Sequence, residues 1–157
     1  MKTLILGLGN DLLSDDAVGL EVVRRLNREA KTPEIEIRET CAASLELVDF
    51  LVGFDRVIIV DAIKTGTGKV GDVRVLDPKD MESGRTPTSL HHVGLATVLA
   101  AGKALGVNMP TRVRVFGIET NEFSVFGGPC SPEVEAAVPK VIHLIRAELD
   151  GSVGRLA

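Results

Sequence analysis

The sequence has no tryptophan, no tyrosine and only two cysteines among its 157 residues. Without tryptophan and tyrosine, we do not expect a surface that stacks nucleic-acid bases. The two cysteines, Cys41 and Cys130, form no C-x-x-C motif and provide no disulfide framework. This cysteine usage predicts a reduced, cytoplasmic protein.

Acidic residues outnumber basic ones by 22 to 18, and the sequence has no long apolar run. The formal net charge is −4, which argues against nucleic acid or an anionic membrane as a partner. No apolar run approaches the ~20 residues needed to span a bilayer, and no small-residue cleavage site of a signal peptide is expected near the start. The composition is that of an ordinary globular protein, with 45% hydrophobic residues, and its length suits one domain over residues 1–157.

Strand-like and helix-like runs alternate along the chain. The apolar runs over 2–8 and 56–62 predict strands buried on both faces, and the alternating run over 34–40 predicts a strand near an edge. A single helix is expected over 89–105, and Ser131 followed by Pro132 predicts the start of the last helix. This alternation predicts a three-layer α/β/α sandwich with a mostly parallel, twisted sheet of about five strands.

The segment GLGNDLLSDDAVG, residues 7–19, begins in the last two residues of the first of these strands and continues beyond it. Gly7 and Gly9 match the start of a dinucleotide-binding fingerprint, but Leu12 occupies the position of the third glycine. Two adjacent acids, Asp15 and Asp16, would also repel a pyrophosphate. Because adjacent helical residues point about 100° apart, we expect Asp15 to cap the helix and Asp16 to face a cleft.

Three candidate ligands fall where the carboxyl ends of the strands are expected, which is where open α/β sheets bind ligands. Asp16 follows the first strand, Asp61 ends the strand over 56–62, and His91 lies near the start of a helix. Two carboxylates and one imidazole suit Ni²⁺, Zn²⁺ or Mn²⁺ and leave coordination positions open for a substrate. Aspartates at strand ends also act as caps, and a histidine at a helix start is often structural, so the spacing leaves both interpretations open.

Four segments resemble the hydrogenase maturation proteases: GLGNDLLSDDAVG, VIIVDAI, SLHHVGLATVL and SPEVEAAVPKV occur in that family's order and spacing. The resemblance runs from residue 3 to about residue 149. Members of the family are endopeptidases that trim the C-terminal extension from the large subunit of nickel–iron hydrogenases. The resemblance implies that Asp16, Asp61 and His91 are the metal-contacting and catalytic residues. It also implies that nickel is carried by the precursor substrate, where the protease recognises it, and that the protease has no permanent metal.

Several points remain open in the sequence. Hydrolysis could proceed by metal-assisted or by aspartic-type attack, and a generic metal-dependent amidohydrolase would use the same residues. A non-catalytic, flavodoxin-like module could instead hold a small anion or nucleotide at GLGN and KTGTGKVG. Some family members have Glu at the position of Asp16, and TCAAS over 40–44 departs from a segment that is often Gly-rich in relatives. The sequence therefore does not identify which hydrogenase is the client. We expect a monomer.

Overall fold

The computed structural model describes residues 1–29, 32–81, 94–121 and 127–151. Its strands are β1 (Thr3–Leu8), β2 (Ile35–Thr40), β3 (Arg56–Ile63), β4 (Val73–Leu76) and β5 (Arg112–Glu119). Its helices are α1 (Val18–Asn27), α2 (Leu47–Leu51), α3 (Leu95–Ala104) and α4 (Pro132–Leu149), with the short 3-10 helices η1 (Asp15–Ala17), η2 (Ser44–Glu46) and η3 (Pro78–Met81).

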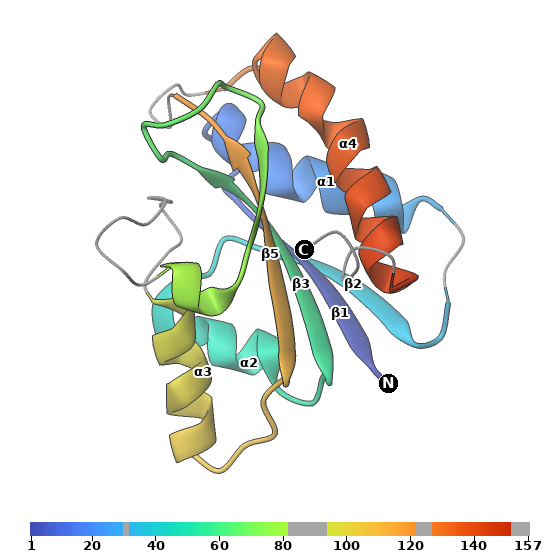
Figure 1. Cartoon of the computed structure of the whole chain (residues 1–157), viewed down its shortest axis with the longest axis vertical. Helices are drawn as coiled ribbons and strands as arrows, with labels where there is room; N and C mark the ends of the chain where they lie inside the picture. Colours follow the sequence, from blue (N-terminus) through green and yellow to red (C-terminus); the bar gives the residue numbers. More distant parts are fainter. Residues whose placement is uncertain (30–31, 82–93, 122–126, 152–157) are drawn as a thin grey trace.

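The five strands form one sheet in the order β2-β1-β3-β5-β4. Strands β2, β1, β3 and β5 run parallel, and β4 is antiparallel to β5 at one edge. Helices α1 and α4 cover one face of the sheet, and α2 and α3 cover the other (Figure 1). The predicted three-layer α/β/α sandwich with a mostly parallel five-stranded sheet is confirmed.

The apolar patterns of the strands match their places in the sheet. Every residue of β1 is buried, and β3 is buried from Val57 to Ile63, because both strands lie between two helical layers. Strand β2 is only half-buried and lies at an edge, as its alternating sequence predicted. None of the helices in the described ranges is long and apolar enough to cross a membrane.

Helix α3 is shorter than the sequence pattern predicted. It begins at Leu95, and Gly94 before it has a φ of 41°, in the left-handed region that a helix interior excludes. The prediction of one continuous helix over 89–105 is therefore wrong at Gly94. His91 and Ser89, which the prediction placed in that helix, lie outside the described residues.

Candidate active site

Three glycines place the segment after β1 directly against the ends of the central strands. A Cβ at Gly7 would lie 2.5 Å from the carbonyl oxygen of Gly19, and a Cβ at Gly9 would lie 2.4 Å from that of Asp16. A Cβ at Gly19 would lie 2.4 Å from a carbonyl oxygen of β1 and from one of β3. These glycines therefore allow backbone contact between the start of α1 and the carboxyl ends of β1 and β3.

The turn between β1 and η1 uses its own amides. The Gly9 amide donates to the carbonyl of Thr40 at 3.2 Å, and the Leu12 amide donates to the Asn10 side-chain oxygen at 2.9 Å. The Leu13 amide donates to the Asn10 carbonyl at 3.1 Å. Three amides of this turn are therefore occupied within the chain, which leaves fewer donors for a bound phosphate than a phosphate-binding loop provides.

An arginine of α1 fixes this turn from outside. Arg24 binds both carboxylate oxygens of Asp11, at 2.8 and 2.7 Å, and also pairs with Glu39 of β2 at 2.7 Å. The hydrogen bonds from Arg24 hold the pKa of Asp11 below its ordinary value. The bidentate contact connects the turn, α1 and the edge strand.

Asp16 and Asp61 both lie at the carboxyl edge of the sheet and are fully buried. Asp16 is in η1, which contacts β3, the strand that carries Asp61. Asp61 follows Val57 and Ile59 at the strand's period of two, and those residues pack in the core beneath α2 and α3. The fold therefore brings the two predicted carboxylates to neighbouring parts of one edge.

Asp15 does not cap its own helix, which corrects the sequence prediction. Its carboxylate accepts a hydrogen bond from the Ser131 amide at 2.6 Å and one from the Ser131 hydroxyl at 2.9 Å. Ser131 precedes α4, and Pro132 begins that helix as predicted. Asp15 is thus a buried tether from η1 to the start of α4, where the helix dipole favours a negative charge.

His91, the third predicted ligand, lies outside the described residues, so its position relative to the two aspartates stays a prediction. The described chain resumes at Gly94, and Leu95 packs in the same core cluster as Ile59, on the face where the alternation of β3 places Asp61. Within the described ranges, no group of three or more His, Cys, Asp and Glu side chains could hold a metal ion. The two aspartates therefore form a candidate metal site only with a further ligand.

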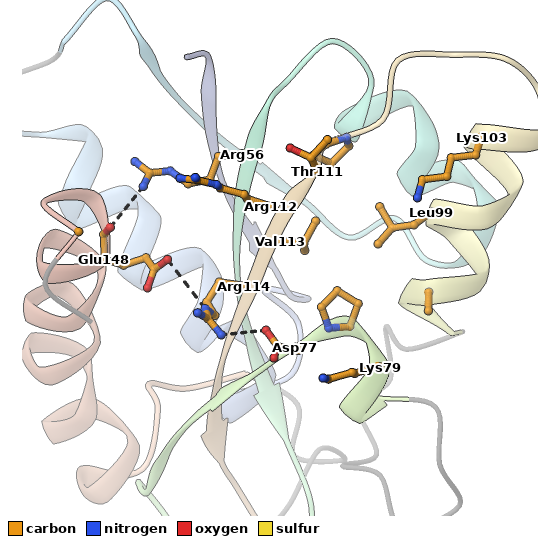
Figure 2. Close-up of a pocket in the computed structure, with 14 residues that line it drawn as sticks. Arg56, Asp77, Lys79, Leu99, Lys103, Thr111, Arg112, Val113, Arg114 and Glu148 are labelled. Atoms are coloured by element: carbon orange, nitrogen blue, oxygen red, sulfur yellow. Dashed lines mark hydrogen bonds and ion pairs between the residues drawn. The ribbon is translucent and has the colours of Figure 1, made fainter. Parts of the chain in front are cut away.

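A cavity of about 810 Å³ lies away from these carboxylates. Figure 2 shows Arg56 and Arg112 among its lining residues, and these begin β3 and β5. Asp61 and Glu119 lie near the other ends of the same strands. The cavity is therefore at the amino edge of the sheet, opposite the candidate active site.

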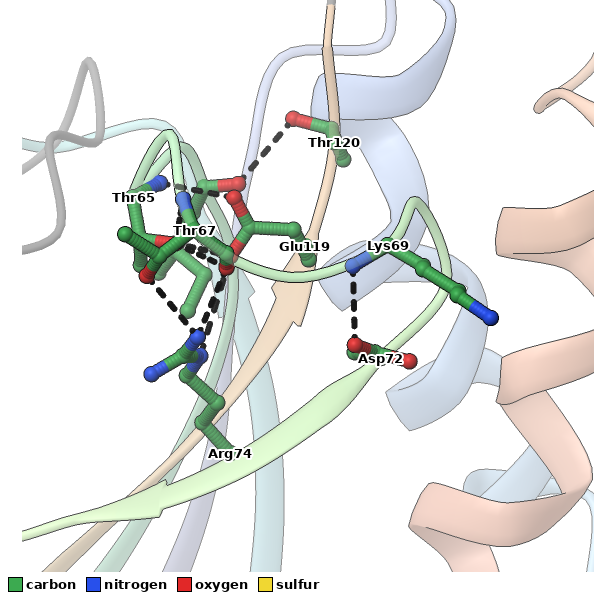
Figure 3. Close-up of polar contacts among 8 residues, drawn as sticks. Thr65, Thr67, Lys69, Asp72, Arg74, Glu119 and Thr120 are labelled. Carbon is green, nitrogen blue, oxygen red and sulfur yellow. Dashed lines mark hydrogen bonds and ion pairs between the residues drawn. The ribbon is translucent and has the colours of Figure 1, made fainter.

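Sequence reasoning missed Glu119, a fourth buried acid at the carboxyl edge beside Asp15, Asp16 and Asp61. It ends β5 and is 3% exposed. Its carboxylate accepts hydrogen bonds from the Thr65 amide at 2.7 Å and the Thr65 hydroxyl at 2.8 Å (Figure 3). An acid that ends an apolar strand was the available signal, and it is the same signal that identified Asp61.

The Gly-rich loop over 64–72 is closed around this acid rather than open to an anion. The Thr67 amide donates to the Thr65 hydroxyl at 3.1 Å, and the Lys69 amide donates to Asp72 at 2.8 Å (Figure 3). A buried carboxylate, that of Glu119, lies beneath the loop and would repel a bound anion. The loop therefore does not support the alternative of an anion- or nucleotide-binding module.

Neither cysteine has the setting of a catalytic nucleophile. Burial raises the pKa of the Cys130 thiol to about 11, and the nearby negative charge of Asp15 contributes to this rise. The Cys130 sulfur lies 3.4 Å from the carbonyl oxygen of Ser14. Cys41 is exposed and belongs to no C-x-x-C motif.

Comparisons with known proteins agree with this architecture. The family model described as hydrogenase maturation protease matches residues 20–148. The hydrogenase 2 maturation protease of Escherichia coli is 30% identical over 151 residues, which cover 95% of this chain and 91% of that protein.

Solved structures of relatives superpose on the fold. The hydrogenase maturating endopeptidase HybD from E. coli matches with a TM-score of 0.83 and 29% identity, over 97% of this chain and 94% of that one. The NiFe hydrogenase maturation protease HybD from Thermococcus kodakarensis matches with a TM-score of 0.71 and 27% identity, over 93% and 97% of the two chains. The chain therefore belongs to the hydrogenase maturation protease family, and it is a peptidase by that membership.

Proposed function

We propose that this chain is an endopeptidase that removes the C-terminal extension from the precursor of a nickel–iron hydrogenase large subunit. The observation that carries the proposal is the placement of Asp16 and Asp61, two fully buried carboxylates, on contacting elements at the carboxyl edge of the sheet. Family membership and the printed names of the relatives support this choice of reaction and client. The closed loops at GLGN and over 64–72 speak against an anion-binding module.

We further propose that Asp16, Asp61 and His91 contact nickel that is already seated in the client. Two carboxylates and one imidazole are borderline-hard donors that suit a divalent ion of this kind. Three ligands leave coordination positions open, so the ion can keep its bonds to the client while the protease binds it. Because both aspartates are fully buried, engagement of a client requires local displacement of the chain that covers them.

The proposed chemistry is addition of water to the scissile peptide carbonyl. A carboxylate of the pair accepts a proton from the attacking water and then donates one to the leaving amine, which is general acid–base catalysis of the aspartic type. Proton transfer of this kind contributes about 10²–10⁴-fold to a rate. Hydrolysis consumes one water and releases the C-terminal extension as a free peptide.

The test is a processing assay with purified chain and a nickel-loaded large-subunit precursor, with the product mass as the readout. We expect the wild type and the exposed control variant Asp49→Asn to release the extension, and nickel-free precursor to remain uncut. Asp61→Asn keeps the shape of the side chain but loses its charge, so its rate should fall by about 10²–10⁴-fold. His91→Ala should abolish processing with an unchanged circular dichroism spectrum. A folded His91→Ala variant that cuts at the wild-type rate would remove nickel recognition from the proposal.

The same preparation tests two further expectations. We propose that the chain acts in the cytoplasm as a monomer, and light scattering coupled to size exclusion measures its mass in solution. We also expect weak nickel binding by the protease alone, because three ligands lack the closed shell of a structural metal site. If calorimetry showed that the protease alone binds nickel with nanomolar affinity at neutral pH, the proposal that the client supplies the nickel would be contradicted.

A further inference from the structure

Strand β5 has an outer edge that β4 covers only in part. It pairs with β3 along its whole length, from Arg112 to Glu119. On the other side, β4 pairs with β5 only between Val115 and Ile118. No described strand lies beside residues 112–114 on that side, but η3, which follows β4, contacts β5, and its residues Pro78 and Lys79 form the opposite wall of the cavity.

The alternation of hydrogen bonds shows which backbone groups this edge presents. The Glu119 amide donates toward β4, to the carbonyl of Asp72 at 2.8 Å, whereas the Arg112 amide donates to the carbonyl of Asp55 at 3.3 Å, on the β3 side. Successive residues of a strand face opposite neighbours, so Val113 shares the orientation of Glu119. Its amide and carbonyl therefore point away from β3, with no backbone partner among the described residues.

The cavity at the amino edge opens beside this stretch of β5. Val113 packs on the α3 side with Leu99, whereas Arg112 and Arg114 belong to the α4 side by alternation along the strand (Figure 2). The cavity is lined by residues from both faces of the sheet, so it opens beside the first residues of β5 rather than under one face. We call this cavity, with residues 112–114 as its floor, the β5 edge groove.

The β5 edge groove is basic, although the chain has a net charge of −4. Five basic and two acidic side chains line it. Arg114 is neutralised by Asp77, at 2.8 Å. Arg112, Lys79 and Lys103 are exposed and form no ion pair with any described residue, so they remain available to a ligand.

We propose that the β5 edge groove binds an extended acidic segment of a partner protein by strand addition. The backbone of Val113 supplies the first hydrogen bonds, as in other cases where a peptide extends a sheet. An added strand points alternate side chains to opposite faces. Acidic side chains would therefore meet Arg112 on the α4 face, and apolar ones would meet Val113 and Leu99 on the α3 face.

This site is independent of the proposed peptidase centre, because it lies at the opposite edge of the sheet. Failure of peptide binding would leave the role of Asp16 and Asp61 untouched. Loss of processing in Asp61→Asn would likewise leave the groove intact. The two proposals can therefore fail separately.

The probe is a fluorescein-labelled ten-residue peptide of alternating Val and Glu, titrated with the full chain and followed by fluorescence anisotropy. A peptide of five Val followed by five Glu has the same charge and composition without the alternation, and an alternating Val–Lys peptide reverses the charge. We expect the alternating acidic peptide to bind at least threefold more tightly than either control. Hydrogen exchange at the Val113 amide should slow when this peptide is bound.

Two matched double variants remove the same charge from different surfaces. Arg112→Ser with Lys103→Ser should weaken binding of the alternating acidic peptide about threefold to tenfold, as expected for two exposed charge pairs. Arg28→Ser with Lys140→Ser, on exposed parts of the chain that do not line the groove, should leave its Kd unchanged.

Four results would overturn the proposal. They are no binding, equal affinity for either control peptide, equal weakening in both double variants, and unchanged exchange at Val113 in the bound state. A dimer in light scattering that Arg112→Ser with Lys103→Ser converts to monomer would assign the edge to a second copy of the chain instead.

Discussion

The buried tether between Asp15 and Ser131 gives a prediction that separates two adjacent acids. Replacing Asp15 by Ala removes two hydrogen bonds, at 2.6 and 2.9 Å, to a charged acceptor at the start of α4. A hydrogen bond to a charged group contributes about 1.5–3 kcal/mol, and a favourable charge at a helix end contributes up to about 2 kcal/mol. Ser131 is half-buried, so water replaces part of this loss.

We therefore expect Asp15→Ala to lower the free energy of unfolding by about 2–4 kcal/mol. For a chain of this size the melting temperature should fall by about 4–16 °C. Asp15→Asn keeps an acceptor for the Ser131 amide but loses the charge and the oxygen that accepts from the hydroxyl, so it should cost less than Asp15→Ala, about 1–2 kcal/mol. Urea denaturation and thermal melts measure both changes.

A double-mutant cycle with Ser131→Ala identifies the partner. Ser131→Ala removes the hydroxyl contact and keeps the backbone amide that donates to Asp15, so the cycle measures the hydroxyl–carboxylate contact. The double variant should cost less than the sum of the single ones by about 0.5–3 kcal/mol. At a temperature where Asp15→Ala is folded, its processing rate should stay close to that of the wild type. An Asp15→Ala variant of unchanged stability that no longer cuts the precursor, beside an active Asp16→Ala, would show that the roles of the two acids are reversed.

Three further perturbations test the scaffold. Gly19→Ala should prevent folding, because its Cβ would lie 2.4 Å from two backbone oxygens, and circular dichroism reports the loss. Glu119→Gln should lower the free energy of unfolding by about 1–3 kcal/mol in urea, because an amide cannot accept from both the amide and the hydroxyl of Thr65. With a pKa of about 11, only about one Cys130 thiol in a thousand is ionised at pH 8, so a disulfide reagent should label exposed Cys41 rapidly and Cys130 slowly. Because that raised pKa favours the thiol form, labelling of Cys130 should accelerate as pH rises toward 11, and equal rates at pH 8 would contradict its burial.

The layered fold could be predicted because its signal is local. The apolar runs in β1 and β3 have no polar face, so they must lie between two helical layers, and the alternating pattern of β2 places it at an edge. The start of α4 was equally readable from Ser131 and Pro132. The same reasoning gave the wrong start for α3. Apolar periodicity continues across Gly94, but the backbone of Gly94 is left-handed and the helix begins only at Leu95.

The candidate site could be predicted only in part, because its remaining contacts join distant segments. Asp61 and Asp16 could be located from the rule that ligands bind at the carboxyl ends of strands. The partner of Asp15 could not, since Ser131 lies 116 residues further along the chain. The bond from Thr65 to Glu119 spans 54 residues and is likewise invisible to a local pattern.

The adjacent acids of the GLGNDLLSDDAVG segment have different surroundings because η1 is held from two sides. Gly9 lets the turn after β1 approach the Asp16 carbonyl of η1, and the carboxylate of Asp15 accepts hydrogen bonds from Ser131, which precedes α4. Asp16, between these restraints, cannot shift without breaking a backbone contact or the tether. The pair is thus one buried anchor and one carboxylate held in place by it. The folded Asp15→Ala variant should therefore process the precursor at close to the wild-type rate and differ mainly in stability, and Asp15→Asn, which keeps a tether, should be the more stable of the two.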